Sequence, residues 1–88
     1  MTVETQTRER LLAILESAFL PLETHASRDN GNVQIRILDG AEAIHIDERP
    51  VKNLQGREEL KEWIVQTRKR VEELGRRLDS WEMPGWAG

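Results

Sequence analysis

The sequence predicts a small α+β domain: a helix, a three-stranded antiparallel meander and a long second helix, with both helices on one face of the sheet. Three observations predict this class. Apolar residues recur at helical spacing over residues 5–20 and 56–81. Three runs between these segments alternate apolar and polar residues, as strands do. The dipeptides Asn30-Gly31 and Asp39-Gly40, which accept the positive φ angles of tight hairpin turns, separate the runs.

The first helix is predicted over residues 5–20. One broad stripe of this segment is apolar and faces the expected core. Pro21 ends the helix, because the residue before a proline is pushed out of the α-helical region. The stripe consists of Leu11, Leu12, Leu15, Ala18 and Phe19.

The strands are predicted at residues 22–27, 33–37 and 43–47. A two-residue loop at Asn30-Gly31 places Ala26 opposite Ile35 in the first hairpin. A two-residue loop at Asp39-Gly40 places Ile35 opposite Ile44 in the second. Val33 then lies opposite Ile46, so that the apolar residues share one face, which is the reason to prefer this register.

The predicted register places both histidines on the outer, solvent-exposed face of the sheet. His25 lies opposite Arg36 and His45 lies opposite Gln34. Because the two flanking strands are separated by the central one, the histidines would be about 9–10 Å apart. A metal ion with ligands at about 2.0–2.1 Å cannot bridge that gap. The chain also has no cysteine. We therefore expect no metal and no cofactor.

The sequence also argues against catalysis. The carboxylates near His45 lie at turns or strand ends, where water keeps their acidity ordinary, whereas a catalytic carboxylate needs burial. The glycines do not form a phosphate-binding loop. We expect no catalytic residue and a protein that is not an enzyme. No apolar run approaches the roughly 18 residues of a membrane span, so we expect a cytoplasmic protein.

The second helix is predicted over residues 56–81 and carries a heptad seam. The seam positions from Leu60 to Trp81 are apolar except for Thr67, and they are spaced alternately four and three residues apart. A helix of that length would be about 39 Å long, whereas an 88-residue globule is roughly 30 Å across. The overhanging end therefore predicts a homodimer, parallel or antiparallel. Its seam is formed by Leu60, Ile64, Val71, Leu74, Leu78 and Trp81. The alternative is a helix that ends at Gly75 and a tail that folds back.

Residues 82–88 form a predicted non-helical tail beyond a single domain of residues 1–81. Its tryptophan lies outside the expected core, and tryptophan is enriched where proteins bind each other. The alternative is that the tail packs against its own domain. Partner-binding residues are predicted in the tail region and on the outer sheet face: Trp81, Met83, Trp86, His25, Arg36 and His45.

These observations favour a small non-catalytic protein–protein interaction module that binds itself and another protein. One alternative is a nucleic-acid-binding regulator that uses a basic cluster. If Glu72 and Glu73 form ion pairs with the arginines four residues later, the basic cluster is simply a solvent-exposed helix face. A further alternative, from small size and a net charge of −3, is an acidic inhibitor of a host or phage enzyme. The basic cluster consists of Arg68, Lys69, Arg70, Arg76 and Arg77.

The order of elements resembles that of double-stranded RNA-binding domains. Those domains present a lysine-rich start to their second helix, where phosphates are clamped. Here the corresponding segment, residues 55–62, reads QGREELKE, with three glutamates where phosphate would approach. The resemblance covers the order of elements only and does not extend to the phosphate-binding residues.

Overall fold

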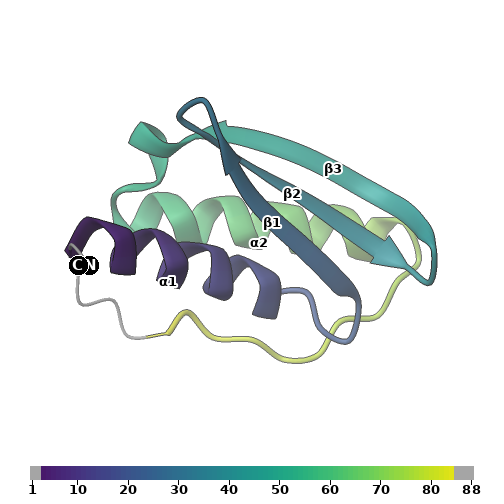
Figure 1. The fold of residues 1–88 in the computed structure, drawn as a ribbon. Coiled ribbons are helices and arrows are strands. Elements are labelled where there is room, and N and C mark those ends of the chain that lie inside the picture. Colours follow the sequence, from purple (N-terminus) through teal and green to yellow (C-terminus); the bar gives the residue numbers. More distant parts are fainter. Residues whose placement is uncertain (1–2, 85–88) are drawn as a thin grey trace.

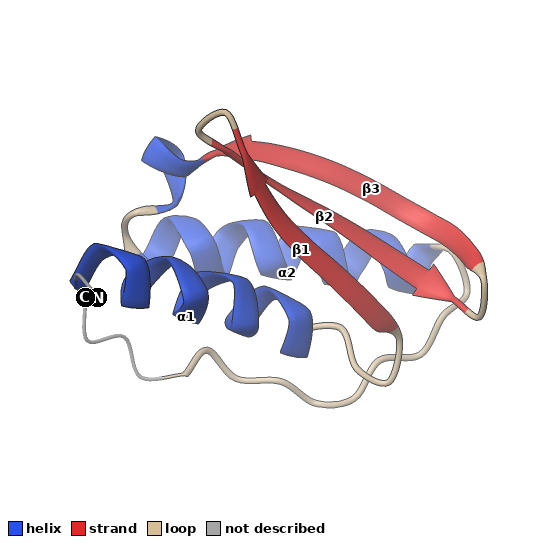
Figure 2. Cartoon of the chain, viewed as in Figure 1, coloured by secondary structure: helices blue, strands red, loops and turns tan. Residues whose placement is uncertain are grey.

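The computed structural model describes residues 3–84, which form a three-stranded sheet with two helices on one of its faces (Figure 1 and Figure 2). The sheet is antiparallel, with the strands in the order β1-β2-β3. The predicted α+β class and order of elements are confirmed. The elements are α1 (Val3–Ser17), β1 (Glu23–Asp29), β2 (Asn32–Asp39), β3 (Glu42–Pro50), the 3-10 helix η1 (Val51–Leu54) and α2 (Arg57–Glu73).

The core lies between the sheet and the two helices. The central strand β2 contributes Val33, Ile35 and Ile37, which are fully buried. The stripe predicted for the first helix is buried except for Leu12, which is half-buried, and it also includes Ile14. Burial of this apolar surface is the main term that stabilises the fold. The helices contribute Leu11, Ile14, Leu15, Ala18 and Phe19 from α1 and its C-terminal end, and Leu60, Trp63, Ile64 and Val71 from α2.

The first hairpin has the predicted register. Ala26 pairs with Ile35 and His25 pairs with Arg36, so the inward and outward faces are as expected. The turn is formed by Asn30-Gly31, both with positive φ, and β1 extends two residues further than predicted, to Asp29. On the outer edge of β1, the Ala26 N–H donates to the side chain of Glu16 in α1, at 3.0 Å.

The second hairpin differs from the prediction. Its turn is Gly40-Ala41 rather than Asp39-Gly40, since Asp39 pairs with Glu42. A bulge between Ile37 and Leu38 then shifts the register once more. The total shift is an odd number of residues, and an odd shift exchanges the two faces of a strand.

The shifted register inverts β3. Ile35 pairs with Asp47 instead of Ile44, and Val33 pairs with Arg49 instead of Ile46. The predicted pairing of His45 with Gln34 is also wrong, because His45 pairs with Ile37 and lies on the helix-covered face. Ile46 consequently lies on the outer face and is 55% exposed.

The second helix ends eight residues earlier than predicted. Gly75, with a φ of +88°, follows the last helical turn. The Arg76 N–H donates to the Val71 carbonyl at 3.4 Å, and the Gly75 N–H donates to the Glu72 carbonyl at 2.9 Å. These two bonds are the Schellman arrangement that closes helices at a left-handed glycine. The observed helix of 17 residues is about 26 Å long, and no part of it overhangs the domain.

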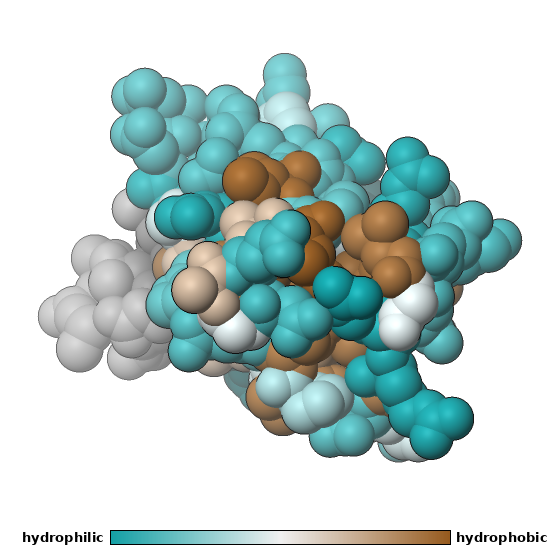
Figure 3. Space-filling model, turned by 90° about the vertical axis from the view of Figure 1, so that its right-hand side faces the viewer, coloured by the Kyte–Doolittle hydropathy of each residue, from teal (hydrophilic) through white to brown (hydrophobic). Residues whose placement is uncertain are grey.

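Five of the six residues of the predicted dimer seam pack within the chain's own fold. Leu60, Ile64 and Val71 are buried in the core, while Leu78 and Trp81 pack against it from beyond the end of α2. Leu74 is 49% exposed. Figure 3 views the end of the molecule where α2 stops, and its apolar side chains form separate patches among polar ones. A homodimer stays a prediction, without the overhanging helix that was its basis.

Replacing Gly75 with alanine is expected to lower the free energy of unfolding by about 1 kcal/mol, because an L-residue is strained at this φ. Apart from the neighbouring residues of the chain, no atom lies within 4 Å of the added Cβ, so overlap with the rest of the fold does not contribute. Urea denaturation measures the change, with Glu72→Ala on the exposed side of α2 as the control. A Gly75→Ala variant as stable as the wild type would show that the helix does not end here.

The segment after α2 returns along the helices toward the end where α2 begins (Figure 1). The Asp79 N–H donates to the Leu20 carbonyl at 2.8 Å. The Arg68 guanidinium donates to the carbonyls of Ala18 and Asp79, each at 2.6 Å. Residues 76–84, here called the return segment, are therefore tied to both helices. Residues 82–84, the described part of the predicted tail, are non-helical.

Candidate functional site

A groove of about 590 Å³ runs between α2 and the return segment. Its α2 wall is built from residues four apart, which share one face of a helix. Those residues are Arg57, Lys61, Val65 and Lys69. Its opposite wall is built by the return segment. The full lining is Arg57, Lys61, Val65, Arg68, Lys69, Glu72, Trp81, Glu82 and Met83.

The groove combines an apolar strip with charged sides. Val65 is 49% exposed in the middle of α2. From the return segment, Trp81 and Met83 are half-buried, since one part of each packs on the core and another part lines the groove. The groove therefore places one exposed apolar side chain beside two half-buried ones.

Cations outnumber carboxylates in the groove, although the whole chain has a net charge of −3. Arg57 is paired with the neighbouring Glu58 at 3.2 Å. Arg68 donates to two neutral carbonyls, which leave its charge uncompensated. Within the part of the chain that the structure describes, Lys61 and Lys69 have no ion-pair partner. The groove therefore carries a positive potential that favours anionic groups.

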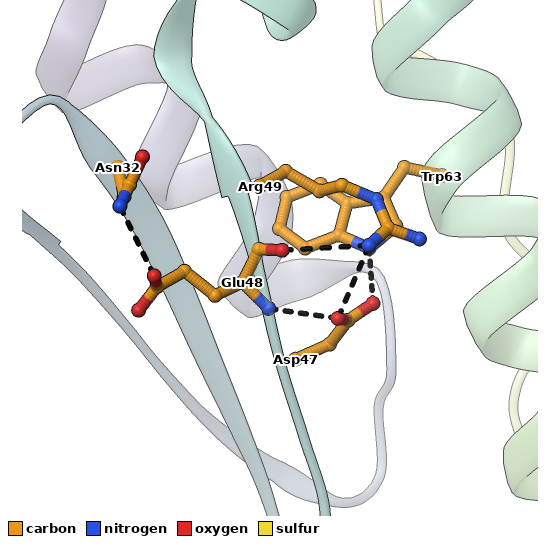
Figure 4. A network of polar contacts seen from close by, with 5 residues as sticks. All are labelled: Asn32, Asp47, Glu48, Arg49 and Trp63. Carbon is orange, nitrogen blue, oxygen red and sulfur yellow. Dashed lines mark hydrogen bonds and ion pairs between the residues drawn. The ribbon is translucent and has the colours of Figure 1, made fainter.

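A second polar cluster lies between β3 and α2 and is shown in Figure 4. The Trp63 Nε1–H donates to Asp47 Oδ2 at 2.8 Å. Asp47 Oδ1 accepts the Glu48 N–H at 2.8 Å and the Arg49 side chain at 3.3 Å. The Arg49 guanidinium lies 5.7 Å from the centre of the Trp63 ring, within the range of a cation–π contact. Asn32 donates to the Glu48 carboxylate at 3.0 Å. The two contacts of Trp63 join β3 to α2, and the Asn32–Glu48 bond joins β2 to β3.

His45 contributes to a shallow groove of about 360 Å³ beside this cluster. Its Nε2 atom is buried and has no hydrogen-bond partner in the described part of the chain. The prediction that His45 lies on the outer face with His25 is thus wrong, because the bulge in the second hairpin turns it toward α2. Asp47, Arg49, Thr67 and Arg70 are among the other lining residues.

The five predicted partner-binding residues that the structure describes do not form one surface. Trp81 and Met83 line the groove beside α2. His25 is on the outer face opposite Arg36, with its Nε2 atom 2.8 Å from the Glu23 carboxylate. His45 is on the other face of the sheet. Trp86 lies outside the described residues.

The predicted basic cluster is also divided. Arg68 and Lys69 line the groove beside the return segment, whereas Arg70 lines the groove beside His45. Arg76 is beyond the end of α2 and forms an ion pair with Asp39 at 2.7 Å, without hydrogen-bond geometry, rather than with Glu72. Arg77 is exposed. These five residues therefore do not form one continuous basic face.

Five lining residues of the main groove were not predicted as binding residues: Glu72, Glu82 and, on one stripe of α2, Arg57, Lys61 and Val65. The spacing of four residues along this stripe, continued by Lys69, is the signal that could have revealed its members. The heptad pattern lies on the buried side of the same helix and does not include this stripe. Apolar and cationic residues on one exposed stripe are a recognisable binding pattern.

No protein-family model matches the chain, and neither does any curated protein or solved structure. Within residues 3–84, no helix is long and apolar enough to cross a membrane. The same residues contain no group of three or more histidine, cysteine, aspartate or glutamate side chains placed to hold a metal ion. The function is therefore inferred from the geometry of the groove.

Proposed function

We propose that the protein is a non-catalytic protein-interaction module that binds a partner protein in the groove between α2 and the return segment. The observation that carries this proposal is the exposure of Val65 in the groove, beside Trp81 and Met83. Apolar and aromatic side chains of this kind, surrounded by charged ones, are typical of the centre of a protein interface.

Two features favour binding over a purely structural role for the groove. Val65 is not part of the hydrophobic core and is 49% exposed. An exposed valine also contributes little to helix stability, because β-branched residues have lower helix propensity than alanine or leucine. Its place between Lys61 and Lys69 on one stripe of α2 is therefore better explained by contact with another molecule.

The proposal is tested by affinity capture from a lysate of the source cells with three baits. Val65→Glu changes the groove. Ile46→Glu is the matched control, because Ile46 is similarly exposed on the opposite face of the sheet. Circular dichroism first establishes that both variants are folded.

The expected result is a protein retained by the wild type and by the Ile46→Glu variant. Its recovery on the Val65→Glu bait should fall about tenfold, as expected when a charge enters the centre of an interface. Equal recovery on all three baits would exclude the groove as the binding surface. Failure of the wild type to retain any protein would count against an interaction module.

A further inference from the structure

The chemistry of the partner can be inferred from the same groove, and this inference rests on the proposed function. We infer that the partner inserts an acidic peptide segment with one apolar anchor side chain. The anchor lies over Val65, between Trp81 and Met83, and flanking carboxylates of the peptide face the cations of α2. The partner class is thus defined by charge and by a single apolar contact.

The cations are arranged along a line rather than at a point. Arg57, Lys61, Val65 and Lys69 follow one another every four residues, so the stripe from Arg57 to Lys69 is about 18 Å long. An extended peptide rises about 3.3 Å per residue. A segment of about six residues therefore spans the whole stripe, and the peptide residue near Val65 lies about two thirds of the way along it from the Arg57 end.

The unpaired lysines of the groove determine the sign of the charge that the peptide should carry. Lys61 and Lys69 are the two that flank Val65 on the stripe, and they are unpaired within the described part of the chain. Glu72 and Glu82 reduce the positive charge of the lining without cancelling it. A basic peptide would bring like charges together, whereas an acidic one is attracted and oriented.

The apolar contact supplies most of the binding free energy, because the ion pairs are weak. Solvent-exposed ion pairs are individually weak and are screened by salt, so a purely acidic segment would bind feebly. An anchor side chain that covers Val65 and touches Trp81 and Met83 removes apolar surface from water on both partners. Charge selects the peptide, and the anchor holds it in place.

The experiment is a selection from a random library of displayed peptides, about eight residues long to cover the stripe. The folded wild-type protein is the target, and the Val65→Glu variant is the counter-target. Enriched peptides are then synthesised with a fluorescent label, and their affinities are measured by fluorescence polarisation at low and high salt. The expected sequences carry several aspartates or glutamates around one large apolar residue.

Charge-reversal variants test the role of the two lysines. Lys61→Glu combined with Lys69→Glu should weaken the binding of the enriched peptides by about tenfold or more, since attraction becomes repulsion. Lys52→Glu combined with Arg77→Glu is the matched control, because both residues are exposed and outside the groove lining. That control should change the affinity less than about twofold, and high salt should weaken binding to the wild type.

The outcomes separate the two proposals. Enriched peptides that are neutral or basic, but lose binding with Val65→Glu, would overturn the acidic chemistry and leave the interaction site standing. If no peptide prefers the wild type over the Val65→Glu variant, both proposals fail. A short labelled oligothymidylate that binds more tightly than every peptide, and is lost with the lysine reversals, would make the groove a nucleic-acid site instead.

Discussion

Replacing Trp63 with alanine is expected to lower the free energy of unfolding by about 3–5 kcal/mol, the usual cost of removing a buried tryptophan side chain. Trp63 is only 3% exposed. The substitution opens a cavity between β3 and α2, removes the indole donor of Asp47 Oδ2 and leaves the Arg49 guanidinium without its ring. Urea denaturation monitored by circular dichroism gives the change directly.

A second substitution at the same position separates packing from hydrogen bonding. Trp63→Phe keeps most of the apolar volume but loses the Nε1–H, so its expected cost is about 1–2 kcal/mol, the usual range for an orphaned acceptor. Combining it with Asp47→Ala should cost less than the sum of the two single changes, because both remove the same bond. A Trp63→Ala variant that loses less than about 1 kcal/mol would contradict the burial of this side chain.

Replacing Arg68 with alanine is expected to lower the free energy of unfolding by about 2–3 kcal/mol. Arg68 donates to the Ala18 carbonyl and to the Asp79 carbonyl, and so joins α2 to the end of α1 and to the return segment. Hydrogen bonds from charged donors contribute about 1.5–3 kcal/mol. The two carbonyls also become acceptors without a donor.

The controls for Arg68 use its neighbour and its closest chemical substitute. Lys69→Ala should change stability by less than about 0.5 kcal/mol, as expected for an exposed side chain. Arg68→Lys should recover only part of the loss, because an ammonium group lacks the planar fork that reaches two acceptors at once. Equal stabilities of Arg68→Ala and Lys69→Ala would show that the return segment is not held by Arg68.

The sequence patterns predicted most of the fold because they are local. Asn30-Gly31 specifies a two-residue turn by its backbone preferences alone, and the first hairpin has the expected pairing of Ala26 with Ile35. The apolar stripe before Pro21 likewise identified the first helix, although α1 (Val3–Ser17) ends at Ser17 and not beside Pro21. In both cases one segment of chain holds enough information to fix its own conformation.

The second hairpin could not be predicted in the same way. Ile44 and Ile46 alternate as if both faced the core, but the bulge beside Ile37 turns Ile46 to the outer face. Asp47 then faces α2, where Trp63 donates to it. That contact joins residues 16 positions apart, and single-sequence periodicity does not contain it.

The end of the second helix shows how two local signals can compete. The apolar spacing continues through Leu78 and Trp81 and favours a longer helix, whereas Gly75 favours a left-handed end. The structure follows Gly75. Leu78 and Trp81 are still used by the core, but the return segment rather than a helix delivers them.

For this reason, the sequence indicated the return-segment wall of the groove but not the stripe of α2 that faces it. Trp81 and Met83 were predicted as partner-binding residues and line the groove, but their neighbours across the groove depend on the chain reversal after Gly75. With the reversal, the tail approaches the stripe that carries Lys61 and Val65. A continuous helix would have placed the same residues far from that stripe.

Hydrogen exchange of the Asp79 backbone amide, followed by NMR, tests the central claim most directly: the return segment is fixed against the helices and forms one wall of the groove. This amide donates to the Leu20 carbonyl at 2.8 Å, although Asp79 itself is exposed. The account predicts that Asp79 exchanges far more slowly than an unstructured chain. An Asp79 amide that exchanges as fast as an unstructured one, while the β2 amides stay protected, would contradict it.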